Sequence, residues 1–113
     1  MEARYPLFIL EKDDLSVRMI KDSNELGWYE QIDIEEGLYA GWDVFGHPIE
    51  LYWERKMGPQ IRLVNDSQQI DKLKEAVLNY ANLARPKIPF VYSGTEDDVV
   101  ALYKAAEEHI KRR

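Results

Sequence analysis

The alternation of hydrophobic and polar residues is clearest between Gly37 and Glu54, where the chain reads GLYAGWDVFGHPIELYWE. A period of two places alternate side chains on opposite faces of a β-strand. Between the two alternating runs, residues 43–46 (DVFG) suit a tight turn, because Asp favours its first position and Gly accepts left-handed backbone. The stretch therefore predicts a β-hairpin. Two such strands are not stable alone in water, so other elements must cover them.

The same alternation assigns the side chains of this hairpin to two faces. The more hydrophobic set comprises Leu38, Ala40, Trp42, Val44, Ile49, Leu51 and Trp53. The more polar set comprises Tyr39, Gly41, Asp43, Glu50, Tyr52 and Glu54. We therefore expect both tryptophans in the core and both tyrosines on the face that meets solvent.

Three further strands are predicted outside this hairpin. Residues 5–11 (YPLFILE) are hydrophobic on both faces, which suits a central strand covered on both sides. A polar turn at 12–14 leads into residues 15–19, where hydrophobic and polar side chains alternate, so these two strands form an N-terminal hairpin. Residues 60–64 make a fifth, short strand.

Helix signals follow a similar logic. Asp22 and Glu25 have capping-box spacing and predict a short helix, after which residues 31–37 read as an acidic connector. A long helix begins near Asp66, carries a hydrophobic stripe and is stopped by Pro86. The last helix begins at Thr95, has acids in its first turn and ends in basic residues, as the helix dipole favours.

Because the strands run mostly consecutively and the long helices come last, the sequence predicts an α+β fold. It consists of an antiparallel sheet of about five strands (two hairpins plus one strand), covered on one face by two C-terminal helices. No repeat or long linker interrupts the chain, so residues 1–113 are predicted to form a single α+β domain.

Composition narrows the chemistry. The chain has no cysteine, which excludes disulfides, thiolate metal sites and a cysteine nucleophile. It has neither a run of about 20 apolar residues nor a signal peptide, so we expect a cytoplasmic protein. A net charge of −6 disfavours nucleic acid and anionic membranes as partners, because both would repel it.

The acidity is concentrated in one segment. Between Asp22 and Asp43 there are seven acids and no Lys or Arg, whereas the rest of the chain has 14 acids and 15 bases. Seven of the 13 aromatic residues lie within residues 28–53, which overlap this segment. Interfaces favour Tyr and Trp, and a carboxylate rim steers a basic partner. The predicted partner-binding residues are Tyr29, Glu30, Asp33, Glu35, Glu36, Tyr39, Asp43 and Tyr52.

Sequence signals for catalysis are weak. His47 and His109 are not paired at metal-ligand spacing, and they read as a turn residue and a C-terminal helix residue. The acidic runs at 11–14 and 33–36 do not match a calcium loop, and the glycines do not form a phosphate loop. We therefore predict no catalytic residue, no cofactor and no metal site, which favours a function other than catalysis.

Two motifs resemble small uncharacterised bacterial proteins. They are YPLFILEKDD and IDIEEGLYAGWDVFGHPIEL, the second containing a Tyr-x-x-Trp-Asp-x-x-Gly-x-Pro pattern at Tyr39, Trp42, Asp43, Gly46 and Pro48. The resemblance covers about the first half of the chain. It implies no established activity or site residue, although some small acidic proteins of this kind act as immunity or antitoxin partners.

The leading hypothesis is a non-enzymatic protein-binding module, immunity-type or regulatory, that recognises a basic partner through the acidic, aromatic segment. One alternative is a small enzyme or ligand-binding domain with a pocket between the sheet and the C-terminal helices, lined by Tyr80, Tyr92, Tyr103 and His109. Another is a homodimer through the aromatic hairpin face, which would leave that face without a free site.

Overall fold

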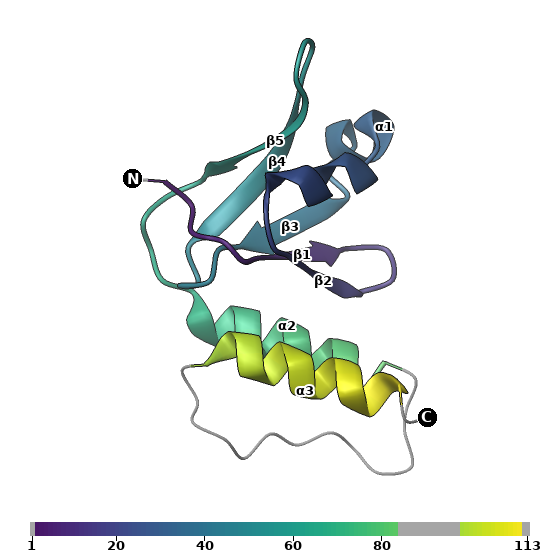
Figure 1. Cartoon of the computed structure of the whole chain (residues 1–113), viewed down its shortest axis with the longest axis vertical. Helices are drawn as coiled ribbons and strands as arrows, with labels where there is room; N and C mark the ends of the chain where they lie inside the picture. Colours follow the sequence, from purple (N-terminus) through teal and green to yellow (C-terminus); the bar gives the residue numbers. More distant parts are fainter. Residues whose placement is uncertain (1, 84–97, 112–113) are drawn as a thin grey trace.

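The computed structural model describes residues 2–83 and 98–111, and its centre is an antiparallel sheet (Figure 1). The strand order is β2-β1-β3-β4-β5, so β1 and β3 lie inside the sheet. The strands are β1 (Leu7–Glu11), β2 (Val17–Ile20), β3 (Tyr39–Trp42), β4 (Pro48–Glu54) and β5 (Gly58–Leu63). The predicted five-stranded antiparallel sheet is confirmed.

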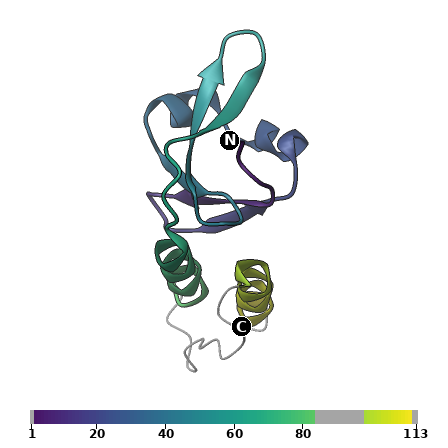
Figure 2. The same ribbon diagram turned by 90° about the vertical axis from the view of Figure 1, so that its left-hand side faces the viewer.

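Helices lie on both sides of this sheet. The two C-terminal helices are α2 (Ile70–Ala81) and α3 (Val99–Lys111), which lie side by side against one face (Figures 1 and 2). Two short helices, the 3₁₀ helix η1 (Ser23–Trp28) and α1 (Gln31–Glu35), pack on the opposite face. The predicted α+β class with two C-terminal helices on one face is confirmed.

Strand β1 is buried from both sides, as its hydrophobic pattern predicts. Phe8 is fully buried among residues of α2 and α3, and its ring meets Tyr103 of α3 edge to face at 5.7 Å. Leu7 and Ile9 point the other way, into a second cluster with Leu26 of η1 and Ile34 of α1. Consecutive residues of β1 therefore serve two separate hydrophobic cores.

The register of the β3–β4 hairpin differs from the prediction. Trp42 pairs with Pro48 and Gly41 pairs with Ile49, because the connecting loop spans residues 43–47. A shift of one residue moves every side chain of a strand to the other face. Trp42 is buried against α2 as expected, but Trp53 packs in the other cluster, on the same face as Tyr39. The assignment of Tyr39 and Tyr52 to one common face is wrong.

Asp43 organises the loop between β3 and β4. It is fully buried, although the alternation predicts it on the solvent face, and that prediction is wrong. Its carboxylate accepts hydrogen bonds from the backbone N–H groups of Arg4, Phe45 and His47, and it lies 3.1 Å from Nδ1 of His47. These bonds satisfy loop amides that would otherwise be buried without partners.

Several helix boundaries also differ from the prediction. The expected connector at 31–37 contains α1, and α2 begins at Ile70 with Gln69 in the cap position, well after Asp66. Gln69 is held by Trp42, whose Nε1 donates to its side-chain oxygen at 3.1 Å, so tertiary contact determines where this helix starts. The cap predicted at Asp22 is confirmed, since its side chain accepts from the N–H of Asn24. The predicted signals at 86 and 95 lie outside the described residues.

Candidate functional site

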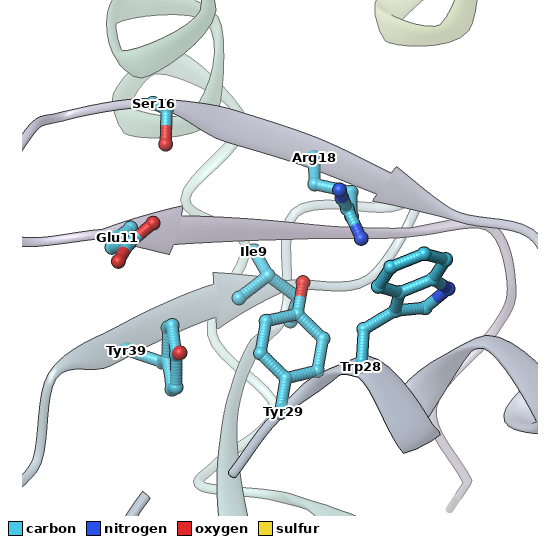
Figure 3. A pocket seen from close by; sticks show the side chains of 7 residues that line it. All are labelled: Ile9, Glu11, Ser16, Arg18, Trp28, Tyr29 and Tyr39. Atoms are coloured by element: carbon cyan, nitrogen blue, oxygen red, sulfur yellow. The ribbon is translucent and has the colours of Figure 1, made fainter. Parts of the chain in front are cut away.

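A pocket of about 210 Å³ opens on the sheet face opposite α2 and α3 (Figure 3). Its base consists of side chains in neighbouring strands, because Ile9 pairs with Arg18 on one side and with Gly41 on the other. Two residues further along the same face of β1, Glu11 pairs with Tyr39. The backbone N–H of Glu11 donates to the carbonyl oxygen of Ser16. The complete lining is Ile9, Glu11, Ser16, Arg18, Trp28, Tyr29 and Tyr39.

Two aromatic residues from the end of η1 complete the pocket. Trp28 is 72% exposed, and the guanidinium of Arg18 lies over its ring, 5.1 Å from the ring centroid. Tyr29 turns inward and meets the ring of Tyr39 edge to face at 4.7 Å. The 3₁₀ helix ends at Trp28, and the extended backbone at Tyr29 directs the two consecutive side chains differently.

The hydroxyl of Tyr29 has an unusual environment. The residue is only 9% exposed, and its oxygen has no hydrogen-bond partner among the described residues. Burial raises the pKa of Tyr29 to about 12, so the phenol stays protonated at neutral pH. Buried polar groups are normally paired, so this hydroxyl is a donor without an acceptor.

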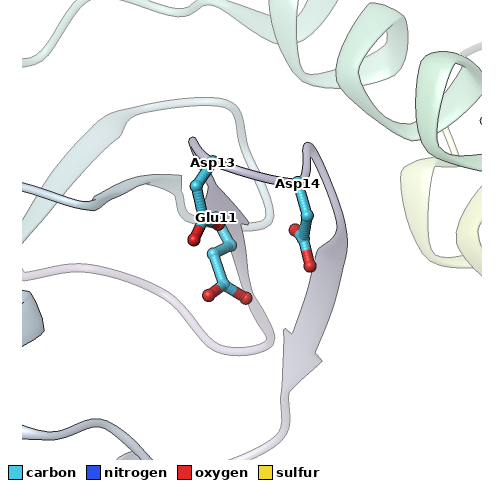
Figure 4. A group of neighbouring side chains, drawn as sticks. All are labelled: Glu11, Asp13 and Asp14. Carbon is cyan, nitrogen blue, oxygen red and sulfur yellow. The ribbon is translucent and has the colours of Figure 1, made fainter.

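Carboxylates gather at the opposite end of the pocket. Glu11, Asp13 and Asp14 each place an oxygen within 4.8 Å of the others at the β1–β2 turn (Figure 4). Partial burial and the charges of Asp14 and Asp13 raise the pKa of Glu11. Asp14 is held by the N–H and hydroxyl of Ser16, which lower its pKa. Exposed acidic turns of this kind are common, and the group alone does not identify a metal site.

Helix α1 brings further acids to the same place. Burial raises the pKa of Tyr39, and the charges of nearby acids raise it further. These acids are Asp33, Glu11, Asp13 and Glu30. The backbone explains this proximity, because the N–H of Leu38 donates to the carbonyl oxygen of Asp33 and the N–H of Lys12 donates to the carbonyl oxygen of Leu38. We call the four carboxylates around Tyr39 the acidic collar, which consists of Glu11, Asp13, Glu30 and Asp33.

Half of the predicted partner-binding residues meet at this site. Tyr29, Glu30, Asp33 and Tyr39 lie at the pocket or in the acidic collar. Glu35 and Glu36 are exposed at the end of α1, next to the acidic collar in the chain.

The two remaining predicted residues lie elsewhere. Asp43 is buried in its loop, so it does not present a charge to a partner. Tyr52 is on the opposite face of β4, where Arg62 lies over its ring at 4.7 Å and also pairs with Glu50.

Sequence reasoning missed the contribution of the N-terminal hairpin. The β1–β2 hairpin adds four residues to the site, which are Glu11, Asp13, Ser16 and Arg18. The end of η1 adds Trp28. The sequence shows Ser16 and Arg18 alternating with the hydrophobic residues at 15, 17 and 19. The sequence does not show that this hairpin lies beside residues 28–39, because only the pairing of β1 with β3 brings the two segments together.

The alternative pocket under the C-terminal helices involves side chains that already have partners. The hydroxyls of Tyr80 and Tyr103 both donate to Glu107, and that of Tyr103 also lies 3.2 Å from the carbonyl oxygen of Val17. Tyr92 lies outside the described residues. The hydrophobic positions of the β3–β4 hairpin are largely covered by the chain itself. The enzyme and homodimer alternatives stay predictions.

Comparisons of the chain with protein-family models, with curated proteins and with solved structures give no match. The resemblance to small bacterial proteins therefore stays a prediction. In residues 2–83 and 98–111, no helix has the length and apolar character needed to cross a membrane.

Proposed function

We propose that this protein is a non-enzymatic binding module that recognises a basic protein through the acidic collar and the residues around it. A regulator or an immunity-type inhibitor is the concrete form of this function. The observation that carries the proposal is the meeting of two acidic segments, one from the β1–β2 turn and one from α1, around Tyr39. They are separate in the sequence and adjacent in the fold.

The local charge balance supports a basic partner. Residues 11–18 and 28–39 contain seven acids and only two bases, Lys12 and Arg18. Most of these carboxylates are exposed, so their fields add in solvent and attract a positively charged surface. Such attraction acts mainly on the association rate and weakens with salt, because counterions screen exposed charges.

Exposed hydrophobic side chains beside the acids support an interface. Trp28 is 72% exposed and Ile32 is 66% exposed, and they lie on the two short helices that carry or flank the acids. Large side chains of this type supply the desolvated centre of many interfaces, while charges form the rim. A basic partner with a hydrophobic contact residue would match both features.

The test is affinity capture from a native lysate, with wild type beside a variant carrying Asp33→Asn, Glu35→Gln and Glu36→Gln. A matched control carries Glu54→Gln, Asp66→Asn and Asp71→Asn, exposed acids outside the site whose loss changes the net charge equally. Each basic protein that wild type retains is then purified and titrated against all three proteins at several salt concentrations.

We expect the site variant to bind about tenfold more weakly, because an exposed charge pair contributes roughly 0.5 kcal/mol and three are removed. The control should bind like wild type, and added salt should reduce the affinity of both. Equal binding by the site variant and the control, or an affinity that salt does not change, would rule out recognition through these acids.

A further inference from the structure

The pocket beside the acidic collar has opposite charges at its two ends. Glu11 and Arg18 belong to neighbouring strands and share one face of the sheet. They are offset by two residues, about 7 Å, along the strand direction and by one strand spacing, about 5 Å, across it. Neither group forms an ion pair within the described part of the chain. Figure 3 shows the carboxylate and the guanidinium on opposite sides of the space above Ile9.

The positive end contains more than one donor. The hydroxyl of Tyr29 points into the pocket towards Arg18, and it lacks an acceptor although its side chain is nine-tenths buried (Figure 3). Since the phenol stays protonated at neutral pH, it can donate there. Trp28 contacts one face of the Arg18 guanidinium, which leaves the N–H groups at its edge for a ligand. A carboxylate is the group that this pair of donors suits best.

The negative end suits a guanidinium. Glu11 is the cross-strand neighbour of Tyr39, so a carboxylate and an aromatic ring lie side by side. Guanidinium groups bind carboxylates through paired N–H bonds and stack on aromatic faces, whereas an ammonium acts as a point charge. Burial, and then repulsion from Asp14 and Asp13, raise the pKa of Glu11, and an incoming cation would relieve the repulsion.

We propose that this pocket binds an arginine residue that carries its own free carboxylate, as at the C-terminus of a protein. The side-chain guanidinium lies between Glu11 and Tyr39, and the terminal carboxylate accepts from Arg18 and from the Tyr29 hydroxyl. An arginine side chain is long enough to separate its two charges across the pocket, whereas the charges of an α-amino acid backbone are too close together. The proposal rests on the proposed function and specifies the partner as a basic protein ending in arginine.

Free arginine has the same two groups, so a titration series separates the two sources. The probes are acetyl-Gly-Gly-Arg with a free carboxylate, the same peptide as its C-terminal amide, the same peptide with citrulline in place of arginine, and free L-arginine. Binding is measured by calorimetry and by NMR shifts of the indole N–H signals at low salt.

We expect the free-acid arginine peptide to bind at least tenfold more tightly than the amide and the citrulline peptide. Tyr29→Phe and Arg18→Gln should weaken binding of the free acid and leave binding of the amide nearly unchanged, whereas Glu11→Gln should weaken both. Tyr52→Phe, on the opposite face, is the matched control and should bind like wild type. If free L-arginine binds as tightly as the free-acid peptide, the ligand of this site is the free amino acid.

Equal binding of the three peptides, or no binding by any of them at millimolar concentration, would overturn the inference. Its failure differs from failure of the proposed function, because Asp33, Glu35 and Glu36 do not line the pocket. If capture of a basic protein depends on those acids but not on Tyr29 or Arg18, the binding module stands without this pocket.

Discussion

At the scale of single residues, burial separates carboxylates that look alike in the sequence. Asp33 and Asp43 both belong to the acidic segment, yet the first is half-buried beside Tyr39 and the second is fully enclosed. The carboxylate of Asp43 accepts from three backbone N–H groups and lies beside the ring of His47, so its role is structural. An acidic residue in a sequence therefore need not be exposed, because backbone N–H groups can satisfy its carboxylate inside the fold.

The structural role of Asp43 leads to a stability prediction. Asp43→Ala removes the acceptor for three backbone N–H groups inside the loop. An unpaired buried donor costs about 1–3 kcal/mol, so we expect the free energy of unfolding to fall by about 3 kcal/mol or more. Urea denaturation followed by circular dichroism measures this change.

Asp66→Asn is the control for that measurement, because Asp66 is exposed and should alter stability by less than about 0.5 kcal/mol. If Asp43→Ala has no larger effect than this control, the hydrogen bonds of the loop do not hold it in place.

At the scale of elements, the loop after β3 joins the sheet to α2. Gly46 has a φ of +83°, and its carbonyl oxygen accepts from the N–H of Gln69 at 2.7 Å. A Cβ at Gly46 would lie 2.7 Å from the backbone nitrogen of Ile70, so the helix start leaves no space for a side chain. The turn that the sequence predicts at this glycine is thus also a packing contact.

This contact predicts that Gly46→Ala destabilises the protein more than Gly37→Ala does. Both glycines have positive φ, but a Cβ at Gly37 meets nothing within 4 Å. The change at Gly37 should therefore cost only the backbone conformational term of about 1 kcal/mol. The change at Gly46 adds a clash with backbone, and overpacking typically costs a further 1–3 kcal/mol. Thermal unfolding of both variants gives the comparison, and equal losses would show that α2 moves aside freely.

At the scale of the whole molecule, β1 connects two hydrophobic clusters. Phe8 belongs to the cluster under α2 and α3, and its neighbours Leu7 and Ile9 belong to the one under η1 and α1. Loss of packing on one side would disturb the strand that supports the other. That residues 1–113 form a single domain stays a prediction, and the cooperativity of unfolding tests it.

We expect Leu73→Ala and Ile49→Ala, one from each cluster, to lower the midpoint of a single unfolding transition. Both side chains are almost fully buried, so each truncation should cost about 2–5 kcal/mol. Circular dichroism follows the helices, and tryptophan fluorescence follows both clusters through Trp42 and Trp53. The two signals should change at the same denaturant concentration in each variant. Separate midpoints would show that the clusters unfold independently.

The elements of the fold could be predicted because their signals are local. Residues 5–11 lack a polar face, so the sequence shows that both sides of this strand are covered. The caps and the helical stripe depend on neighbours within a few residues of one another. The β3–β4 register was predicted wrongly because the loop at 43–47 and the packing of Trp42 against α2 determine it, and neither is a local property.

The sequence by itself determined the class of fold, the order of most elements and the concentration of acids between residues 22 and 43. Periodicity, capping and charge are properties of short segments, which remain readable in an unfolded chain. Only the tertiary structure decided which acids meet, that Asp43 is enclosed and that the Tyr29 hydroxyl lies unpaired in a pocket with Glu11 and Arg18. The reason is that strand pairing and burial depend on distant segments, whose contacts form together when the chain folds.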